Sequence, residues 1–104
     1  MFFNKRKLKK YIDENGNLIL SRQSYLTNLP DNLTVEGNLF ITETAIKQLP
    51  KGLIIKGDLW ARKTELQGLP EDIQLEGKIY CSEDSPLVIL AFEGYEIRIV
   101  ENKI

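Results

Sequence analysis

Three aromatic side chains recur at twenty-residue intervals, and their spacing favours a binding role: Phe40, Trp60 and Tyr80. Each lies between two apolar residues, so alternation along a strand turns the ring away from the interior. Arg62 follows two positions after Trp60, and aromatic and arginine side chains dominate the hot spots of protein interfaces. We predict that Phe40, Trp60, Tyr80 and Arg62 form a partner-binding face. Stacking of the rings as structural support for a sheet is the alternative.

The sequence gives little support to catalysis. Histidine, the commonest general base and a common metal ligand, is absent. Cys81 falls on the inward side of its strand with no base nearby, which is typical of a small core residue. The paired carboxylates at 71–72 and 83–84 fall in exposed turns rather than in a pocket. We therefore expect a protein that is not an enzyme, with no catalytic residue, metal site or cofactor.

The chain that positions these residues repeats itself every twenty residues. The dipeptides Leu29-Pro30, Leu49-Pro50 and Leu69-Pro70 mark the period, and a glycine lies midway at Gly37, Gly57 and Gly77. Self-similarity at this period is typical of a solenoid, in which each repeat forms one coil and the core is buried between stacked coils. We interpret the three glycines as bend positions that allow a positive φ, and not as a phosphate-binding loop.

Alternating apolar residues flank each glycine and predict half-buried strands. In the first regular repeat Leu33, Val35, Leu39 and Ile41 point inward. Residues 17–20 resemble residues 38–41 and predict a degenerate first coil, with one extra residue that bulges within 21–25. The sequence therefore predicts a mainly β solenoid of three to four coils.

Equivalent positions of a solenoid stack into columns about 4.8 Å apart, and three columns alternate in charge. Stacked opposite charges predict ion pairs between coils. A fourth column, Thr44 and Thr64 followed by Asp84, predicts side chains that bond to turn backbone. The charged columns are Asp31, Lys51, Glu71; Glu36, Lys56, Glu76; and Glu43, Lys63, Glu83.

The repeat resembles the leucine-rich repeat, through Leu39-x-Ile41-x-x-Thr44-x-Ile46-x-x-Leu49-Pro50 and its counterpart from Leu59 to Pro70. The short Leu-Pro-ended period is similar to repeats of bacterial effector-type and small phage proteins. A glycine-centred run replaces the usual convex segment, so a β-helix is the alternative fold. The resemblance implies a binding protein, such as a phage- or bacterium-encoded inhibitor of a larger enzyme, including an anti-CRISPR-like inhibitor of a host-defence nuclease complex.

The two ends of the chain depart from the repeat, and we expect them to cap a single domain of residues 1–104. Residues 1–15 predict an N-terminal cap, which is a short helix begun by Asn4 or a strand, and residues 16–85 form the solenoid. Residues 86–104 predict a C-terminal β-hairpin that turns at Glu93-Gly94.

Fifteen acidic and fourteen basic residues nearly cancel, which argues against a general affinity for DNA or anionic membranes. A single cysteine, and no apolar run of membrane-spanning or signal-peptide length, lead us to expect a cytoplasmic protein. The expected partner is a protein. The alternatives are a self-assembling homodimer or homo-oligomer and, less favoured, a nucleic-acid-binding protein that uses the basic residues of the segment from Lys5 to Lys10.

Overall fold

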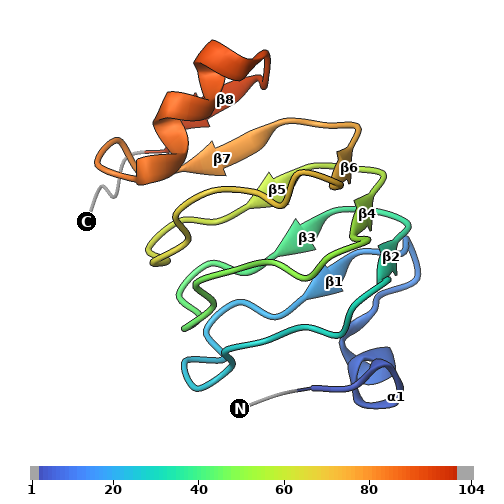
Figure 1. Ribbon diagram of the computed structural model, residues 1–104. Helices are drawn as coiled ribbons and strands as arrows, with labels where there is room; N and C mark the ends of the chain where they lie inside the picture. The colour runs from blue at the N-terminus through green and yellow to red at the C-terminus, as the bar shows by residue number, and fades with distance from the viewer. Residues whose placement is uncertain (1–2, 101–104) are drawn as a thin grey trace.

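The computed structural model describes residues 3–100, which form a solenoid of about four turns built from parallel strands. Short strands lie on two sides of each coil, joined by turns (Figure 1). One sheet has five strands in the order β1-β3-β5-β7-β8 and the other has three in the order β2-β4-β6. The predicted mainly β solenoid is confirmed.

Each strand is two or three residues long, because the glycine and the following turn interrupt the alternating pattern on either side. The five-stranded sheet comprises β1 (Leu18–Ile19), β3 (Leu39–Phe40), β5 (Leu59–Trp60), β7 (Ile79–Cys81) and β8 (Ile97–Ile99). The three-stranded sheet comprises β2 (Thr34–Val35), β4 (Ile54–Ile55) and β6 (Gln74–Leu75). Strands of successive coils pair in register, for example Phe40 with Trp60 and Trp60 with Tyr80.

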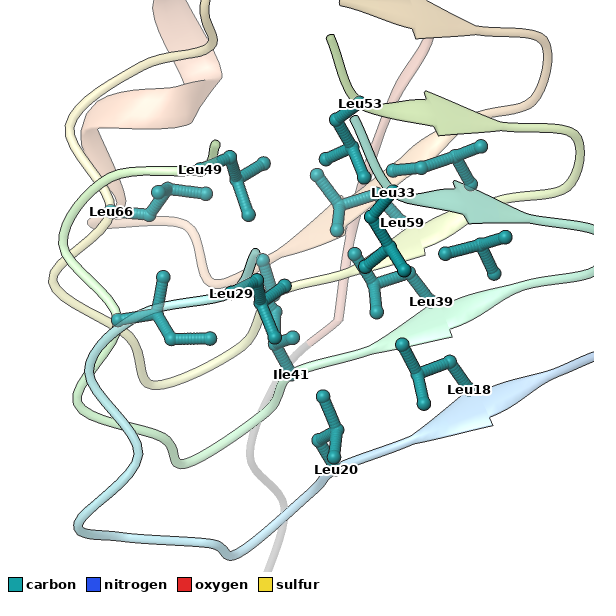
Figure 2. Packing of buried hydrophobic residues seen from close by; sticks show 14 of the residues in the cluster. Leu18, Leu20, Leu29, Leu33, Leu39, Ile41, Leu49, Leu53, Leu59 and Leu66 are labelled. Carbon is teal, nitrogen blue, oxygen red and sulfur yellow. The ribbon is translucent and has the colours of Figure 1, made fainter. Parts of the chain in front are cut away.

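The core is a stack of aliphatic side chains inside the coils. Leucine and isoleucine from the two sheets and from the third side of each coil point toward one another (Figure 2). The four inward residues predicted in the first regular repeat are all buried, and Leu39 and Ile41 are wholly inaccessible. No single coil encloses such a core, so stacking of coils is what removes this apolar surface from water.

A short helix closes the N-terminal end of the solenoid, where the sequence predicts a helix or a strand as alternatives. The segment α1 (Lys5–Leu8) continues into the 3₁₀ turn η1 (Lys9–Tyr11), and the side chain of Asn4 caps α1 by accepting from the amide of Lys7 at 2.9 Å. Phe3 and Leu8 are buried in the core. The cap thereby covers the first coil with its own apolar side chains.

The predicted C-terminal β-hairpin is wrong. Its first half is the 3₁₀ helix η2 (Pro86–Glu93), and its second half, β8, pairs parallel to β7. Ser85 caps η2 by accepting from the amide of Leu87 at 3.1 Å, and Gly94 ends it in a left-handed conformation. Residues 86–93 thus connect β7 to β8 as a helix, and β8 completes the sheet as a parallel strand rather than as half of a hairpin. Residues 101–104 of the predicted hairpin lie outside the described residues.

The predicted role of the midway glycines is also wrong. Among the described residues, positive φ occurs at glycine only at Gly16, Gly52 and Gly94. A β-carbon on Gly57 would instead lie 2.8 Å from the carbonyl carbon and oxygen of Gly37 and would overlap Oδ1 of Asn38. These positions are glycine because successive coils approach too closely for any side chain.

The side chains that occupy this close approach form a polar ladder of Asn17, Asn38 and Asp58. Oδ1 of each accepts a hydrogen bond from a backbone amide of the next coil, at 2.7 Å: Asn38 N, Asp58 N and Lys78 N respectively. Each rung thus bonds the start of one strand to the start of the next. The ladder holds β1, β3, β5 and β7 in register.

The charged columns form in part. Lys56 pairs with Glu36 at 2.9 Å, and Glu43 pairs with Lys63 at 3.5 Å and with Arg22 at 3.7 Å. Within residues 3–100 the remaining column, Asp31, Lys51 and Glu71, makes no ion pair.

The predicted threonine column is confirmed at two of its three positions. Thr44 Oγ1 donates to the carbonyl of Ile41 at 2.8 Å, and Thr64 Oγ1 donates to the carbonyl of Ala61 at 3.1 Å. Thr44 is itself buried. Each hydroxyl therefore holds the turn that follows β3 or β5.

Candidate protein-interaction surface

The aromatic column, Phe40, Trp60 and Tyr80, lies on the outer face of the five-stranded sheet. Each ring belongs to the second residue of its strand, and the first residue, such as Leu39 or Leu59, is wholly buried. The rings of Trp60 and Tyr80 stack with centroids 3.8 Å apart and planes within 3°. Phe40 stacks on Trp60 at 5.8 Å and 19°. Parallel pairing in register places the three rings one above another.

The stacking alternative is therefore present in the structure, and the rings are half-buried by one another. Such pairs stabilise a sheet by about 0.5–1.5 kcal/mol beyond the area they bury. Aliphatic residues already fill the core beneath the sheet. The three rings therefore lie on the surface and do not contribute to the interior. Stacking also fixes the orientations of the rings, so these side chains lose less conformational entropy when a partner binds them.

The column continues beyond the rings at both ends. Ile19 of β1 pairs with Phe40 and is 45% exposed. At the other end Arg98 of β8 pairs with Tyr80, and its guanidinium forms an ion pair with Glu96. The aromatic surface is thus bounded by an aliphatic side chain on one side and a charged pair on the other. Sequence analysis missed Arg98, because β8 lies outside the repeat.

Arg62, the fourth predicted residue, lies in the turn after β5 and is half-buried. Its carbonyl accepts from the amide of Glu43 at 3.0 Å, one coil earlier. It lies one residue beyond Ala61, whose side chain is buried, and so borders the aromatic column without being part of the ring stack.

Two polar residues beside the column have a structural role that the sequence did not reveal. Asn38 and Asp58 immediately precede Leu39 and Leu59, and both have an oxygen bonded to the backbone of the next coil. The recurring dipeptides Gly16-Asn17, Gly37-Asn38 and Gly57-Asp58 were the available signal.

Most of the ion pairs join one coil to the next. The hydrogen bond and charge of Glu36 raise the pKa of Lys56, and the more distant Glu76 acts in the same direction. Both Lys56 and Glu36 are largely exposed, so this pair stabilises the stack only weakly. The two acidic neighbours of Lys56 make the middle coil a poor basic patch.

Several basic side chains of the N-terminal cap have contacts within the protein. Lys5 Nζ donates to the carbonyl of Asn32 at 3.0 Å. Lys7 and Lys10 lie over the rings of Phe3 and Tyr11, at 4.7 and 5.5 Å from the centroids. The Lys5 bond joins the cap to a coil, and the Lys7 and Lys10 contacts lie within the cap, so these three lysines have roles that need no nucleic acid.

A shallow hollow of about 560 Å³ lies on the third side of the coils, away from the aromatic column. Its walls come from equivalent segments of three coils, and most of the surface that they expose to the hollow is apolar. The lining residues are Thr27, Asn28, Ala45, Lys47, Gln48 and Gln67.

The one cysteine of the chain lies in the core. Cys81 is wholly buried, and its burial raises the pKa of the thiol, which opposes formation of the reactive thiolate. In that same range, no cluster of three or more acidic or cysteine side chains is placed to hold a metal ion. The helices there are all too short or too polar to cross a bilayer.

No protein-family model, curated protein or solved structure matches this chain. The likeness to leucine-rich repeats therefore rests on the sequence pattern alone. What the structure establishes is a small parallel-strand solenoid that presents a fixed row of aromatic rings.

Proposed function

We propose that this protein is a non-enzymatic interaction module that binds a protein partner through the outer face of its five-stranded sheet. The observation that carries the proposal is the ordered stack of Phe40, Trp60 and Tyr80 on the side of the sheet that the core does not use. Three rings in one row form an apolar stripe, and exposed apolar stripes on small proteins are typical binding surfaces.

The chemistry of the surface favours a protein as the partner. Rigid aromatic side chains bury much area at little cost in side-chain entropy, and Arg62 at the border can bond to carbonyl or carboxylate groups. The neighbouring ion pair of Glu96 and Arg98 gives the stripe a polar rim. The size and the flat face suit an inhibitor that covers a site on a larger enzyme, such as a host-defence nuclease complex.

The test is affinity capture with the full chain as bait, in cells that express it naturally, followed by mass spectrometry. Trp60→Ala with Tyr80→Ala removes the central rings and should abolish capture of the partner. Ser82→Glu is the second variant, because it places a carboxylate beside Tyr80 while leaving every ring in place. Tyr25→Ala is the matched control, since Tyr25 is 78% exposed in the turn of the first coil, outside the strands.

Circular dichroism and the melting temperature show whether each variant is folded. Loss of the same partner with both column variants, and its retention with Tyr25→Ala, supports the proposal. If Ser82→Glu and the folded double variant both retain the partner, the aromatic column is a structural stack and another surface does the binding.

A further inference from the structure

The two ends of the five-stranded sheet differ in how they are covered. At the β1 end, α1 and η1 lie beneath the first coil (Figure 1), and Ile12 pairs antiparallel with Leu18. At the other end β8 is the last strand, and over residues 3–100 nothing pairs with its outer edge. An unpaired edge is a template for another strand.

The outer edge of β8 offers a regular set of backbone groups. Glu96 accepts from the amide of Ile79, and Val100 donates to the carbonyl of Cys81, both at 2.9 Å. Alternation along the strand then leaves the N–H and C=O groups of Ile97 and Ile99 on the outer side. The Ile97 carbonyl meets only the guanidinium of Arg98 on its own strand, at 3.5 Å.

The charges of β8 are complementary to themselves. Glu96 and Arg98 lie two residues apart on one face, with Ile97 between them. If a second β8 runs antiparallel with Ile97 opposite Ile97, each Glu96 faces the Arg98 of the other copy. The neighbouring register, centred on Arg98, would instead place two guanidinium groups directly opposite, which is destabilising. Of these two registers the charges favour the one centred on Ile97, which also brings the outer backbone groups of Ile97 together.

Apolar side chains gather at this end of the solenoid. Ile99 pairs with the buried Cys81, yet it is 44% exposed, because no further coil covers it. On η2, Ile89 and Phe92 are 63% and 91% exposed. They lie three residues apart on a 3₁₀ helix and so share one side of it.

We propose that the partner of β8 is a second copy of this chain, bound antiparallel with Ile97 opposite Ile97. This pairing is two-fold symmetric and closes on itself, whereas the covered β1 edge prevents head-to-tail growth into a filament. It joins two five-stranded sheets into one continuous sheet and places both aromatic columns on the same face. A dimer of this form binds a partner bivalently, although its formation does not depend on what the aromatic column binds.

The experiment is sedimentation equilibrium of the full chain and of two charge reversals, Arg98→Glu and Glu96→Arg. The wild-type protein is expected to sediment at twice its monomer mass of 12.0 kDa. Each reversal alone places like charges opposite at both symmetric contacts and should raise the dimer dissociation constant by at least about tenfold. Glu83→Arg is the control, since it reverses a charge in the turn after β7 and should leave the dimer unchanged.

Mixing distinguishes this register from any other association. An equimolar mixture of Arg98→Glu and Glu96→Arg should form a heterodimer, because each acidic strand then faces a basic one, and the double reversal Glu96→Arg with Arg98→Glu should restore the homodimer. Recovery on mixing also shows that both single variants are folded. A wild-type monomer at concentrations up to about 1 mM, a dimer insensitive to the reversals, or a mixture that stays monomeric would each overturn the proposal.

Discussion

Replacing Gly57 with alanine tests whether the close approach of successive coils and the polar ladder hold the solenoid together. The new β-carbon would lie 2.8 Å from the carbonyl atoms of Gly37 and would displace the side chain of Asn38. That displacement breaks the 2.7 Å hydrogen bond from Asp58 N to Asn38 Oδ1. A partly buried amide left without its acceptor costs about 1–3 kcal/mol, and the overpacking itself costs about 1–3 kcal/mol. We expect the free energy of unfolding to fall by about 2–6 kcal/mol, the sum of the two effects.

The assay is urea denaturation followed by circular dichroism, with Gly68→Ala as the matched control. A β-carbon at Gly68 meets no heavy atom within 4 Å, and the φ of Gly68 is not positive. Gly68→Ala should therefore be neutral or stabilise by up to about 1 kcal/mol. A Gly57→Ala protein within about 0.5 kcal/mol of wild type would refute the reasoning, because the spread of ordinary surface substitutions is that large.

Three further predictions concern single polar groups. Thr44→Val should lower the free energy of unfolding by about 1–2 kcal/mol, because the buried 2.8 Å hydrogen bond to the Ile41 carbonyl is lost. Thr64→Val should lower it less, because the corresponding bond is longer, at 3.1 Å, and only partly buried. Equal effects of the two variants in urea denaturation would contradict this. The backbone and then the side-chain amide of Asn17 lower the pKa of Asp13, so the stability that this carboxylate contributes is present above its unfolded pKa of about 3.9 and is lost as the pH falls through the folded pKa. Asp13→Asn should therefore reduce the loss of stability between neutral and acid pH, and an unchanged pH profile would count against the assignment. Burial raises the pKa of the Cys81 thiol, so the stability that the protonated thiol contributes is present below the ordinary thiol pKa and is lost as the pH rises above it. A thiol reagent should label Cys81 only on unfolding, because the side chain is buried. Rapid labelling of the native protein would show that the core is open.

The period of the sequence was sufficient to predict the solenoid, because a fixed period makes equivalent residues neighbours. The register of Phe40 with Trp60 and Tyr80 follows from that alone, as do the inward positions of Leu39 and Ile41. The ion pairs of Glu36 with Lys56 and of Glu43 with Lys63 follow from the same columns.

The hairpin could not be excluded from the sequence, because its failure depends on tertiary pairing. Residues 86–92 form an apolar run that includes Val88, Ile89 and Phe92, residue types that favour strands locally. The Ser85 cap, Pro86 in the first helical turn and Gly94 at the end favour a 3₁₀ helix, and β8 pairs parallel with β7 instead of antiparallel with residues 86–92. Arg98, which pairs with Tyr80 at the end of the aromatic column, comes from this segment outside the repeat and was therefore not predicted.

The polar ladder was missed for a different reason. The midway glycines admit two explanations, a left-handed bend or a close approach, and the sequence does not distinguish between them. The geometry does, since Oδ1 of Asn17 or Asn38 occupies the space that a side chain on Gly37 or Gly57 would need. A recurrent Gly-Asn or Gly-Asp in a solenoid of this period therefore indicates backbone bonding between coils.

The most direct test of the proposed interaction surface uses Trp60, which is the only tryptophan of the chain. Protein labelled with 5-fluorotryptophan gives one ¹⁹F resonance, from the centre of the aromatic column, and the purified partner is titrated into it. If the partner covers the column, the resonance shifts or broadens in proportion to complex formation, and Ser82→Glu weakens the response. An unshifted, unbroadened Trp60 resonance at saturating partner would contradict the claim that this face is the binding site.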